Sequence, residues 1–462
     1  MNQTSSMLGL GMVAALAVAG CTSPLQKEAR AEWERVALEA TEPTEGGPAP
    51  TAPAATTPTA SDLADYLRIA ALNNPGLKAA FERWKAAIER VPQVRALPDP
   101  KFTYGYFVQE VETRVGPQKH RVGVMQAFPW LSKLRLRGDV AAREARVHGH
   151  LYDAEKLRLF YQVRKVYHDY AYLGRSIAIV GESMDLLRNL EAVVRARYAA
   201  GAASHPNLIQ TQVELGKLED RLKSLQALQP ALVAQLNAVL GRDITTPVPW
   251  PKGHPTDHPP LPVADLIAAL AQENPELHAA RERIRTAEAG ADLAAKTGYP
   301  DFALGLTTIQ TDSRNDMDVD DNGKDPVLLT LDVTLPIWRD KNRAAEREAA
   351  ARLAAAKHTH ANRTLNLSAE LRVALYHYDD ARRKVNLFRD TLVPKSEEGL
   401  KATQTAFAAG KGRFLDIIDA ERTLLEFRLL TERALANQAI RLAELERLAG
   451  RELRQTVGRP PQ

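Results

Sequence analysis

The chain contains two copies of one unit. The sequence Asn-Pro-Gly-Leu at residues 74–77 recurs as Asn-Pro-Glu-Leu at residues 274–277, an offset of 200. The offset is 209 further along, where the matched pairs include Tyr167/Tyr376, Gly201/Gly410 and Gly241/Gly450. Proline and glycine strongly punctuate local structure, so their recurrence at matched turns indicates a duplicated folding unit. Any fold for this chain must therefore accommodate the same order of elements twice.

Each copy reads as a helix, two strands, a long helix and a returning helix. The first helix is expected at about 62–96 and again at 262–296. Strands are expected at about 101–110 and 119–129, and again at 301–310 and 326–337. Apolar residues alternate with mostly polar ones through the last strand, at Val327, Leu329, Leu331, Val333 and Leu335. Segments of about ten residues with this alternation are typical of transmembrane β-strands.

The segment after the first strand pair predicts an unusually long helix. No proline occurs between Pro129 and Pro206, and apolar residues recur every three or four positions, which is a coiled-coil pattern. A single helix from Leu131 to Ala200 would span about 105 Å. Pro230 and Pro394 lie inside the helical pattern and are expected to kink or interrupt it.

Cys21 follows a short apolar segment in the way typical of a bacterial lipoprotein signal. The apolar run from Leu8 to Ala19 is shorter than the roughly 20 residues that span a bilayer, and it fits a signal peptide, although no Lys or Arg precedes it. Cys21 is the only cysteine, so it forms no internal disulfide. We expect it to carry covalent lipid, and we expect no other cofactor.

These features divide the chain into six segments. Residues 1–20 are the expected signal peptide, and residues 21–60 are a lipid-anchored tail with a linker rich in Pro, Ala and Thr. The two copies occupy residues 61–250 and 262–452, joined by a linker at 251–261 and followed by a tail at 453–462. No segment after the signal is apolar enough to form a transmembrane helix.

The composition argues against several functions. Lys and Arg number 61 against 57 Asp and Glu, a net charge of +4, which is too balanced to indicate nucleic-acid binding. No nucleophile with a nearby base and no phosphate-binding loop occurs, so an enzyme is not expected. Residues 318–323 (Asp-Val-Asp-Asp-Asn-Gly) open like a calcium loop, but Leu329 stands where an EF-hand has glutamate. We expect a solvated loop there and no metal site.

Four strands in one chain cannot close a barrel of useful width. An open sheet edge in hydrocarbon would leave backbone groups unpaired, at several kcal/mol each. If the strands lie in a membrane, other copies of the chain must complete the sheet.

The duplicated unit and two turn motifs resemble the outer-membrane efflux protein (TolC) family. The motifs are residues 197–201 (Arg-Tyr-Ala-Ala-Gly) and residues 406–410 (Ala-Phe-Ala-Ala-Gly), the latter followed by Phe-Leu-Asp-Ile-Ile-Asp-Ala-Glu-Arg at 414–422. The resemblance covers about residues 60–452. It implies a mainly α protein with a transmembrane β-barrel: a homotrimer with a twelve-stranded barrel in the outer membrane and a helical tunnel across the periplasm. The lipid-bearing cysteine is a common variant in this family.

Asp416 and Asp419 are the candidate periplasmic gate. They lie three residues apart, so both face one side of a helix. The resemblance places the constriction at this motif, where a trimer would form two stacked rings of carboxylates that attract cations. The alternative is that acidic residues simply favour the first turn of a helix. The first copy has Asn207 and Gln210 at the matching positions, so only one copy would supply charge.

The turns around Gly201, Ser204, Gly410 and Arg413 are the expected tips that contact a periplasmic adaptor. The alternative, compatible with the first, is that they are ordinary turns between helices, because glycine commonly follows a helix.

The resemblance implies an exit channel that passively conducts cargo from an inner-membrane pump and its adaptor. Residues 97–100 (Leu-Pro-Asp-Pro) and 126–130 (Gln-Ala-Phe-Pro-Trp) most resemble members paired with heavy-metal pumps, so metal cations are the favoured cargo. Channels for multidrug efflux or for type I protein secretion remain alternatives. A periplasmic adaptor is a further alternative, but it should carry one helical hairpin and no duplication.

Overall fold

The computed structural model describes residues 24–41, 62–201, 204–251, 253, 262–316 and 318–453. The predicted signal peptide, Cys21 and most of the two tails and linkers lie outside these residues. The chain forms two compact units. The strand unit comprises Met1–Thr41, Arg83–Gly149 and Ala279–His360, and the helical unit comprises Glu42–Glu82, His150–His278 and Ala361–Gln462. Each unit therefore contains the matching part of both sequence copies.

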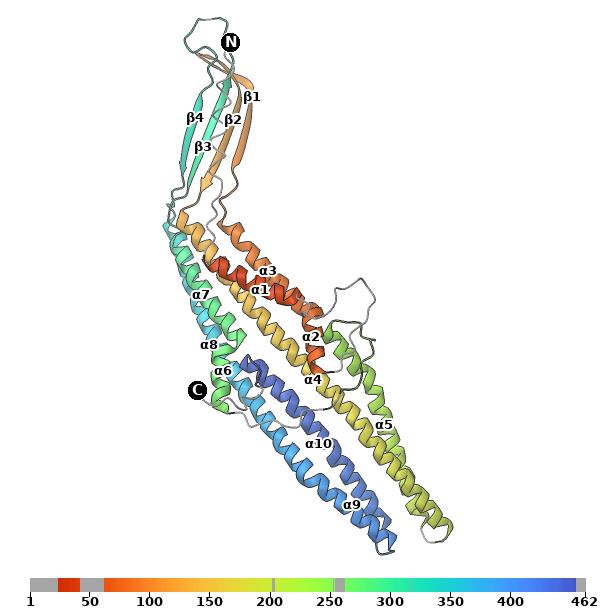
Figure 1. Ribbon diagram of the computed structural model, residues 1–462. Helices are drawn as coiled ribbons and strands as arrows, with labels where there is room; N and C mark the ends of the chain where they lie inside the picture. Colours follow the sequence, from red (N-terminus) through yellow and green to blue (C-terminus); the bar gives the residue numbers. More distant parts are fainter. Residues whose placement is uncertain are drawn as a thin grey trace. The chain divides into compact units, whose positions relative to one another are not determined.

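The strand unit is built around one antiparallel sheet in the order β1-β2-β3-β4 (Figure 1). Its strands are β1 (Lys101–Thr113), β2 (Gly116–Phe128), β3 (Phe302–Thr311) and β4 (Val327–Val333). All four strands were predicted, but β4 ends four residues before the expected position 337. The two hairpins lie side by side through β2 and β3, where Phe128 is opposite Phe302 and Val124 is opposite Leu306.

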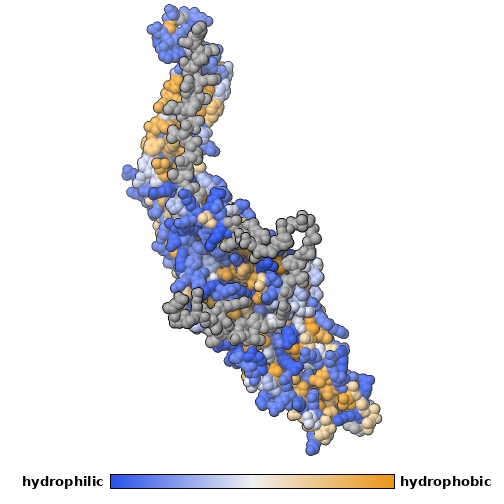
Figure 2. All heavy atoms as spheres, viewed as in Figure 1, coloured by the Kyte–Doolittle hydropathy of each residue, from blue (hydrophilic) through white to orange (hydrophobic). Residues whose placement is uncertain are grey.

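The register places the apolar residues on one face of the sheet. Residues directly opposite each other share a face, and one row across all four strands is Phe102, Val124, Leu306 and Leu329. The next row is Tyr104, Val122, Thr308 and Val327. Most of these side chains are exposed in the single chain, and Figure 2 shows apolar residues over the strands and hydrophilic residues at the loop end of the sheet. This face has the composition of a surface that contacts lipid.

The opposite face carries more small and polar residues, although Met125, Ile309 and Leu328 also lie on it. A Cβ at Gly123 would lie 2.7 Å from Oγ1 of Thr307, and a Cβ at Gly305 would lie 2.4 Å from Oγ1 of Thr330. Threonine therefore packs directly over glycine at both positions. The amphipathic sheet predicted from the alternation is confirmed.

The strand unit also contains parts of five helices. They are α1 (Pro24–Thr41), the later part of α3 (Pro75–Arg95), the start of α4 (Leu131–Ala199), the later part of α7 (Pro275–Ala295) and the start of α8 (Arg339–Leu387). Helix α1 was not predicted, because its residues belong to the segment expected to be a tail and linker. Glu28 of α1 forms an ion pair with Arg146 of α4, and the ring of Trp33 lies 6.0 Å from the ammonium of Lys85 in α3.

The helical unit contains the remaining parts of α3, α4, α7 and α8. It also contains the helical hairpin that ends each copy. Its other elements are α2 (Leu63–Asn73), α5 (His205–Leu240), α6 (Val263–Glu273), the π-helix η2 (Phe388–Leu392), α9 (Val393–Ala408) and α10 (Phe414–Ala449). No helix in the described ranges is both long and apolar enough to cross a membrane.

The single helices predicted at 62–96 and 262–296 are wrong, because each is divided in two. Asn74 and Asn274 adopt extended backbone angles, with ψ of 121° and 119°. Each asparagine precedes a proline, which disfavours the helical conformation of the residue before it. The amide of Asn74 donates to the carbonyl of Val239 at 2.8 Å, and that of Asn274 donates to the carbonyl of Leu448 at 2.9 Å. The break thus fastens the end of the returning helix in both copies.

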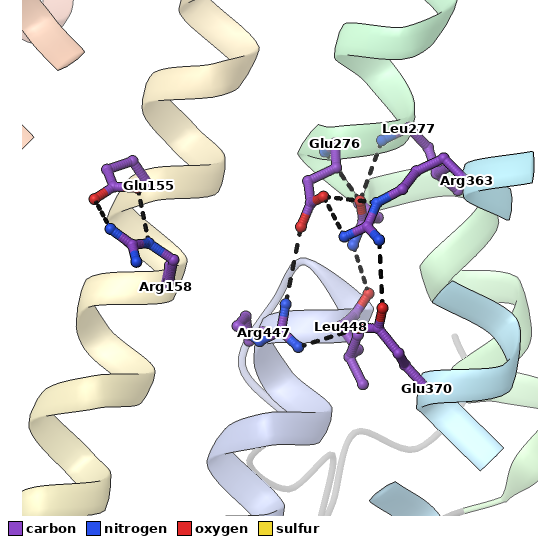
Figure 3. Close-up of polar contacts among 9 residues, drawn as sticks. Glu155, Arg158, Glu276, Leu277, Arg363, Glu370, Arg447 and Leu448 are labelled. Carbon is purple, nitrogen blue, oxygen red and sulfur yellow. Dashed lines mark hydrogen bonds and ion pairs between the residues drawn. The ribbon is translucent and has the colours of Figure 1, made fainter. Parts of the chain in front are cut away.

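An ion-pair network reinforces this junction in the second copy (Figure 3). Glu276 at the start of α7 lies between Arg363 of α8, at 2.5 Å, and Arg447 of α10, at 3.8 Å. Both arginines also contact Glu370 of α8, at 3.3 and 3.6 Å. Two carboxylates and two guanidinium groups therefore link three helices.

The long helix after the first strand pair is confirmed, because α4 runs unbroken for 69 residues. In the second copy the equivalent helix is interrupted by η2. A single residue separates the end of η2 from Pro394. The expected interruption therefore occurs just before Pro394, in the five residues of η2. It is absent at Pro230, where α5 continues to Leu240. An apolar core joins α4, α5 and α10 through residues that include Val180, Met184, Leu187, Leu218, Ile418 and Leu425.

Candidate gate and hairpin tips

Both predicted turns contain a glycine in the left-handed backbone conformation. The φ angles are 72° at Gly201 and 74° at Gly410, and only glycine adopts this region without strain. Ser204 and Arg413 occupy the N-cap positions of α5 and α10, and neither side chain caps its helix. The structure therefore places all four predicted tip residues at helix–helix turns.

The second turn is closed by backbone hydrogen bonds. The N–H groups of Lys411 and Gly412 both donate to the carbonyl of Ala406, at 2.9 and 3.0 Å. A Cβ at Gly412 would lie 2.9 Å from the backbone nitrogen of Phe407. Gly412 therefore allows the chain to pass close to the end of α9.

Arg197 connects the two hairpin tips. Its guanidinium lies 4.4 Å from the centre of the Phe407 ring, and its Nη1 donates to the Phe407 carbonyl at 3.3 Å. Phe407 also contacts Phe414 at the start of α10, with ring centres 5.7 Å apart. The end of α4 is thus held to both helices of the second hairpin. Arg197 and Phe407 belong to the two turn motifs, but the sequence pattern does not predict a contact between them.

Asp416 lies in the first turn of α10. Arg413 donates to its Oδ1 at 2.8 Å, and this hydrogen bond lowers the pKa of Asp416 below its ordinary value. The carboxylate is partly exposed, with 39% of the side chain accessible. Asp416 is therefore ionised at neutral pH and already paired within its own chain.

Asp419 is more exposed, at 68% of its side chain, and lies 3.1 Å from Nη1 of Arg422. Arg422 also binds Glu214 of α5, whose side chain is buried. That contact, together with Lys217 at 2.8 Å, lowers the pKa of Glu214. An Asp–Arg–Glu chain therefore connects the candidate gate to the first hairpin. Glu214 was not predicted from the sequence, because nothing in the local pattern shows that its side chain is buried.

A shallow groove lies beside this chain of charges. Its volume is about 530 Å³, and its lining combines Glu214, Lys217 and Arg422 with residues of the first turns of α5: His205, Pro206, Ile209, Gln210 and Val213. The groove thus opens at the base of the first tip.

Glu421 follows within the same motif and is buried, with 4% of its surface exposed. Ser183 of α4 donates to its Oε1 at 2.6 Å, while its Oε2 has no hydrogen-bond partner among the described residues. Burial raises the pKa of Glu421 above its ordinary value of 4.5. The motif therefore presents Asp416 and Asp419 outward and one desolvated carboxyl inward.

In the described residues, no group of three or more His, Cys, Asp or Glu side chains is placed to hold a metal ion. Three carboxylates of the 312–325 loop contact neighbouring groups. Asp316 pairs with Arg314, Asp321 pairs with Lys324, and Asp325 accepts the Thr311 N–H at 2.8 Å.

A family model described as "Outer membrane efflux protein" matches residues 266–451, which span most of the second copy. Over these residues the chain is similar to the outer membrane efflux protein family. The cobalt-zinc-cadmium resistance protein CzcC of Cupriavidus metallidurans is 21% identical over 393 residues, covering 83% of this chain and 89% of CzcC.

The chain matches solved structures of the same fold over nearly their full length. VceC from Vibrio cholerae has a TM-score of 0.70 at 18% identity, covering 84% of this chain and 96% of VceC. The outer-membrane channel OprN has a TM-score of 0.72 at 16% identity, covering 89% and 99%. The chain therefore has the fold of these outer-membrane channels, which confirms the predicted combination of a mainly helical body with four strands per chain.

Proposed function

We propose that this efflux protein is the exit channel of a tripartite system that removes heavy-metal cations. In the proposal, three copies form the channel, Cys21 carries a lipid anchor, and cargo arrives from an inner-membrane pump through a periplasmic adaptor. The observation that carries the choice of cargo is the similarity to a cobalt-zinc-cadmium resistance protein along most of both chains. The channel itself is passive, and the pump supplies the energy.

The open sheet supports the proposed trimer. β1 and β4 are the two edges of the sheet, and an unpaired edge would be costly in hydrocarbon. If β4 of one copy pairs with β1 of the next, three copies close a barrel of twelve strands (3 × 4). The exposed apolar face then contacts lipid, and the face with glycine and threonine lines the lumen.

The tips support the proposed contact with an adaptor and the proposed gate. Both turns expose helix ends, and Asp416 and Asp419 lie within two turns of the second tip. Three copies would bring three such pairs around one axis. The Asp–Arg–Glu chain would then hold the second hairpin against the first when the gate is closed.

The partner pump tests this proposal. The protein is crosslinked in its native cells, purified by a C-terminal tag, and its inner-membrane partner is identified by mass spectrometry. We expect a proton-driven pump of the heavy-metal type with its adaptor. A drug pump would contradict the metal cargo alone, and a peptide-exporting ATPase would place the channel in type I protein secretion. Recovery of no pump and no adaptor would contradict the tripartite system.

A further inference from the structure

One motif recurs where each strand pair leads into its long helix. Residues 130–135 read Trp-Leu-Ser-Lys-Leu-Arg at the start of α4, and residues 338–343 read Trp-Arg-Asp-Lys-Asn-Arg at the start of α8. At an offset of 208, Trp, Lys and Arg recur in the order Trp-x-x-Lys-x-Arg. Both motifs lie in the strand unit, directly beyond the apolar face of the sheet.

In the first copy the lysine of this motif is neutralised. Lys133 is buried, and its ammonium lies 3.0 Å from Asp301 and 2.7 Å from the carbonyl of Tyr299. Asp301 also accepts the N–H of Trp130 at 2.9 Å. Since Asp301 immediately precedes β3, this ion pair connects the strand pair of the first copy to that of the second.

In the second copy the equivalent lysine has no such partner. Lys341 is exposed, as are Arg339 and Arg343, and none of the three has an ion pair with another described residue. The position that matches Asp301, at the offset of 200, is Lys101 at the start of β1. The carboxylate that neutralises the first motif is therefore replaced by a second cation.

The duplication places these two cations together in the proposed trimer. β2 pairs with β3 within one chain, and in a closed barrel β4 would pair with the partner subunit's β1 in the equivalent way. Lys341 would then face the partner subunit's Lys101, as Lys133 faces Asp301. Two neighbouring cations repel each other and attract an anion.

The surroundings indicate which anion. Trp338 is 71% exposed, and Leu335 and Ile337 beside it are 70% and 67% exposed. Tryptophan at a membrane surface lies at the level of the lipid headgroups. The cluster of Lys341, Arg339 and Arg343 thus continues directly from a surface suited to acyl chains, which favours a lipid phosphate over a free phosphate.

We propose that Lys341 and the partner subunit's Lys101, with Arg339 and Arg343, bind the headgroup of an anionic phospholipid in the periplasmic leaflet of the outer membrane. This proposal rests on the trimer of the proposed function, because neighbouring copies complete each site. The first motif binds no such lipid at Lys133, since Asp301 already neutralises that lysine.

Native mass spectrometry of the full-length protein in detergent tests the proposal. The protein is mixed with equal amounts of phosphatidylglycerol and phosphatidylcholine of identical acyl chains, and the lipids retained on the trimer are counted. We expect phosphatidylglycerol to be retained preferentially by the wild type. Lys101→Asp supplies the carboxylate that Asp301 supplies in the first copy, so the preference should fall about fivefold or more. The trimer should dissociate at a higher temperature in this variant.

Two further variants serve as controls. Lys101→Arg should keep the preference, and Lys223→Asp, which makes the same charge change on the surface of α5, should leave it unchanged. If Lys101→Asp does not assemble, Lys341→Gln is measured in its place and should also lose the preference. A wild-type trimer with no preference, or a Lys101→Asp trimer that keeps it, would overturn this inference alone. A wild type that is not trimeric would overturn the proposed function as well.

Discussion

Neighbouring carboxyl groups of one motif experience opposite environments. Asp416 and Asp419 are accessible and paired with arginine in their own helix, whereas Glu421 is buried between α10 and α4. Two arginines of α10 lie on either side of this packing: Arg422, next to Glu421, binds Glu214, and Arg428 contacts Glu182 of α4 at 3.3 Å. Arg428 only partly offsets the burial that raises the pKa of Glu421. Ionisation of Glu421 therefore opposes the packing of the second hairpin against α4.

The first prediction concerns this buried carboxyl. Because its pKa is raised in the folded protein, its stabilising contribution is complete below pH 4.5 and is lost as the pH rises through the raised pKa. We expect Glu421→Gln to leave the unfolding temperature unchanged at low pH. At neutral pH it should raise that temperature by about 2 °C or more. Thermal unfolding from pH 4 to pH 8 checks this.

Glu426→Gln is the matched control for this prediction, because Glu426 lies on the exposed face of the same helix. It should give the pH dependence of the wild type. A Glu421→Gln protein that follows the wild-type curve at every pH would contradict the prediction, because it would show that ionisation of Glu421 does not destabilise the folded protein.

The second prediction concerns the candidate gate. If Asp416 and Asp419 form rings in the trimer, the double variant Asp416→Asn/Asp419→Asn should lose cation selectivity by several-fold in planar bilayers. Asp220→Asn, on the exposed face of α5, should conduct like the wild type. Unchanged selectivity in the double variant would support the simpler interpretation that these residues stabilise only the start of α10.

The sequence identified the outward carboxylates because their spacing and motif are local. It did not identify their partners. Arg422 lies three residues from Asp419, but its contact with Glu214 spans 208 residues of chain. Burial of Glu421 likewise depends on the packing of α4 against α10. The local sequence around Glu421 does not show that this packing buries its side chain.

Among the elements, η2 distinguishes the second hairpin from the first. A π-helix widens one helical turn and often marks a functional position, and Pro394 removes a further backbone donor just after it. At the offset of 209, the matching residues of α4 remain in a continuous α-helix. The hairpin that carries Asp416 and Asp419 is therefore the one that begins at a weakened turn.

The third prediction follows from this weakened turn. Pro394→Ala restores a backbone donor, so the amides of η2 and the first turn of α9 should exchange hydrogen more slowly. The effect should correspond to local stabilisation of about 1–3 kcal/mol. Hydrogen exchange measured by mass spectrometry reports this directly. Pro230→Ala is the comparison, because Pro230 lies in a helix with no π-helical turn; equal slowing in both variants would contradict a special role for η2.

Long elements were predictable because their signals accumulate over many residues. The absence of proline from 130 to 205 predicted α4, and strict alternation predicted β4. The division at Asn74 was not predicted, since the helical pattern continues on both sides of the asparagine. α5 continues through Pro230, so a proline alone did not determine where a helix ends.

In the whole molecule, the duplicated sequence does not correspond to two separate structural halves. Each compact unit combines matching segments of both copies, and the Asn–Pro junctions fasten both returning helices in the same way. Three of the differences between the copies bear on the proposals: Asp416 and Asp419 against Asn207 and Gln210, η2 against continuous helix, and Lys101 against Asp301. These differences coincide with the proposed gate and with the proposed boundary between subunits.

The metal content of cells tests the central claim most directly. Cells that lack this protein are exposed to zinc, cobalt or cadmium, and their metal content is measured by inductively coupled plasma mass spectrometry. We predict several-fold higher accumulation than in the parent strain, restored to the parental level by the wild-type gene. Parental metal levels together with new sensitivity to drugs or dyes would contradict metal export as the function of this channel.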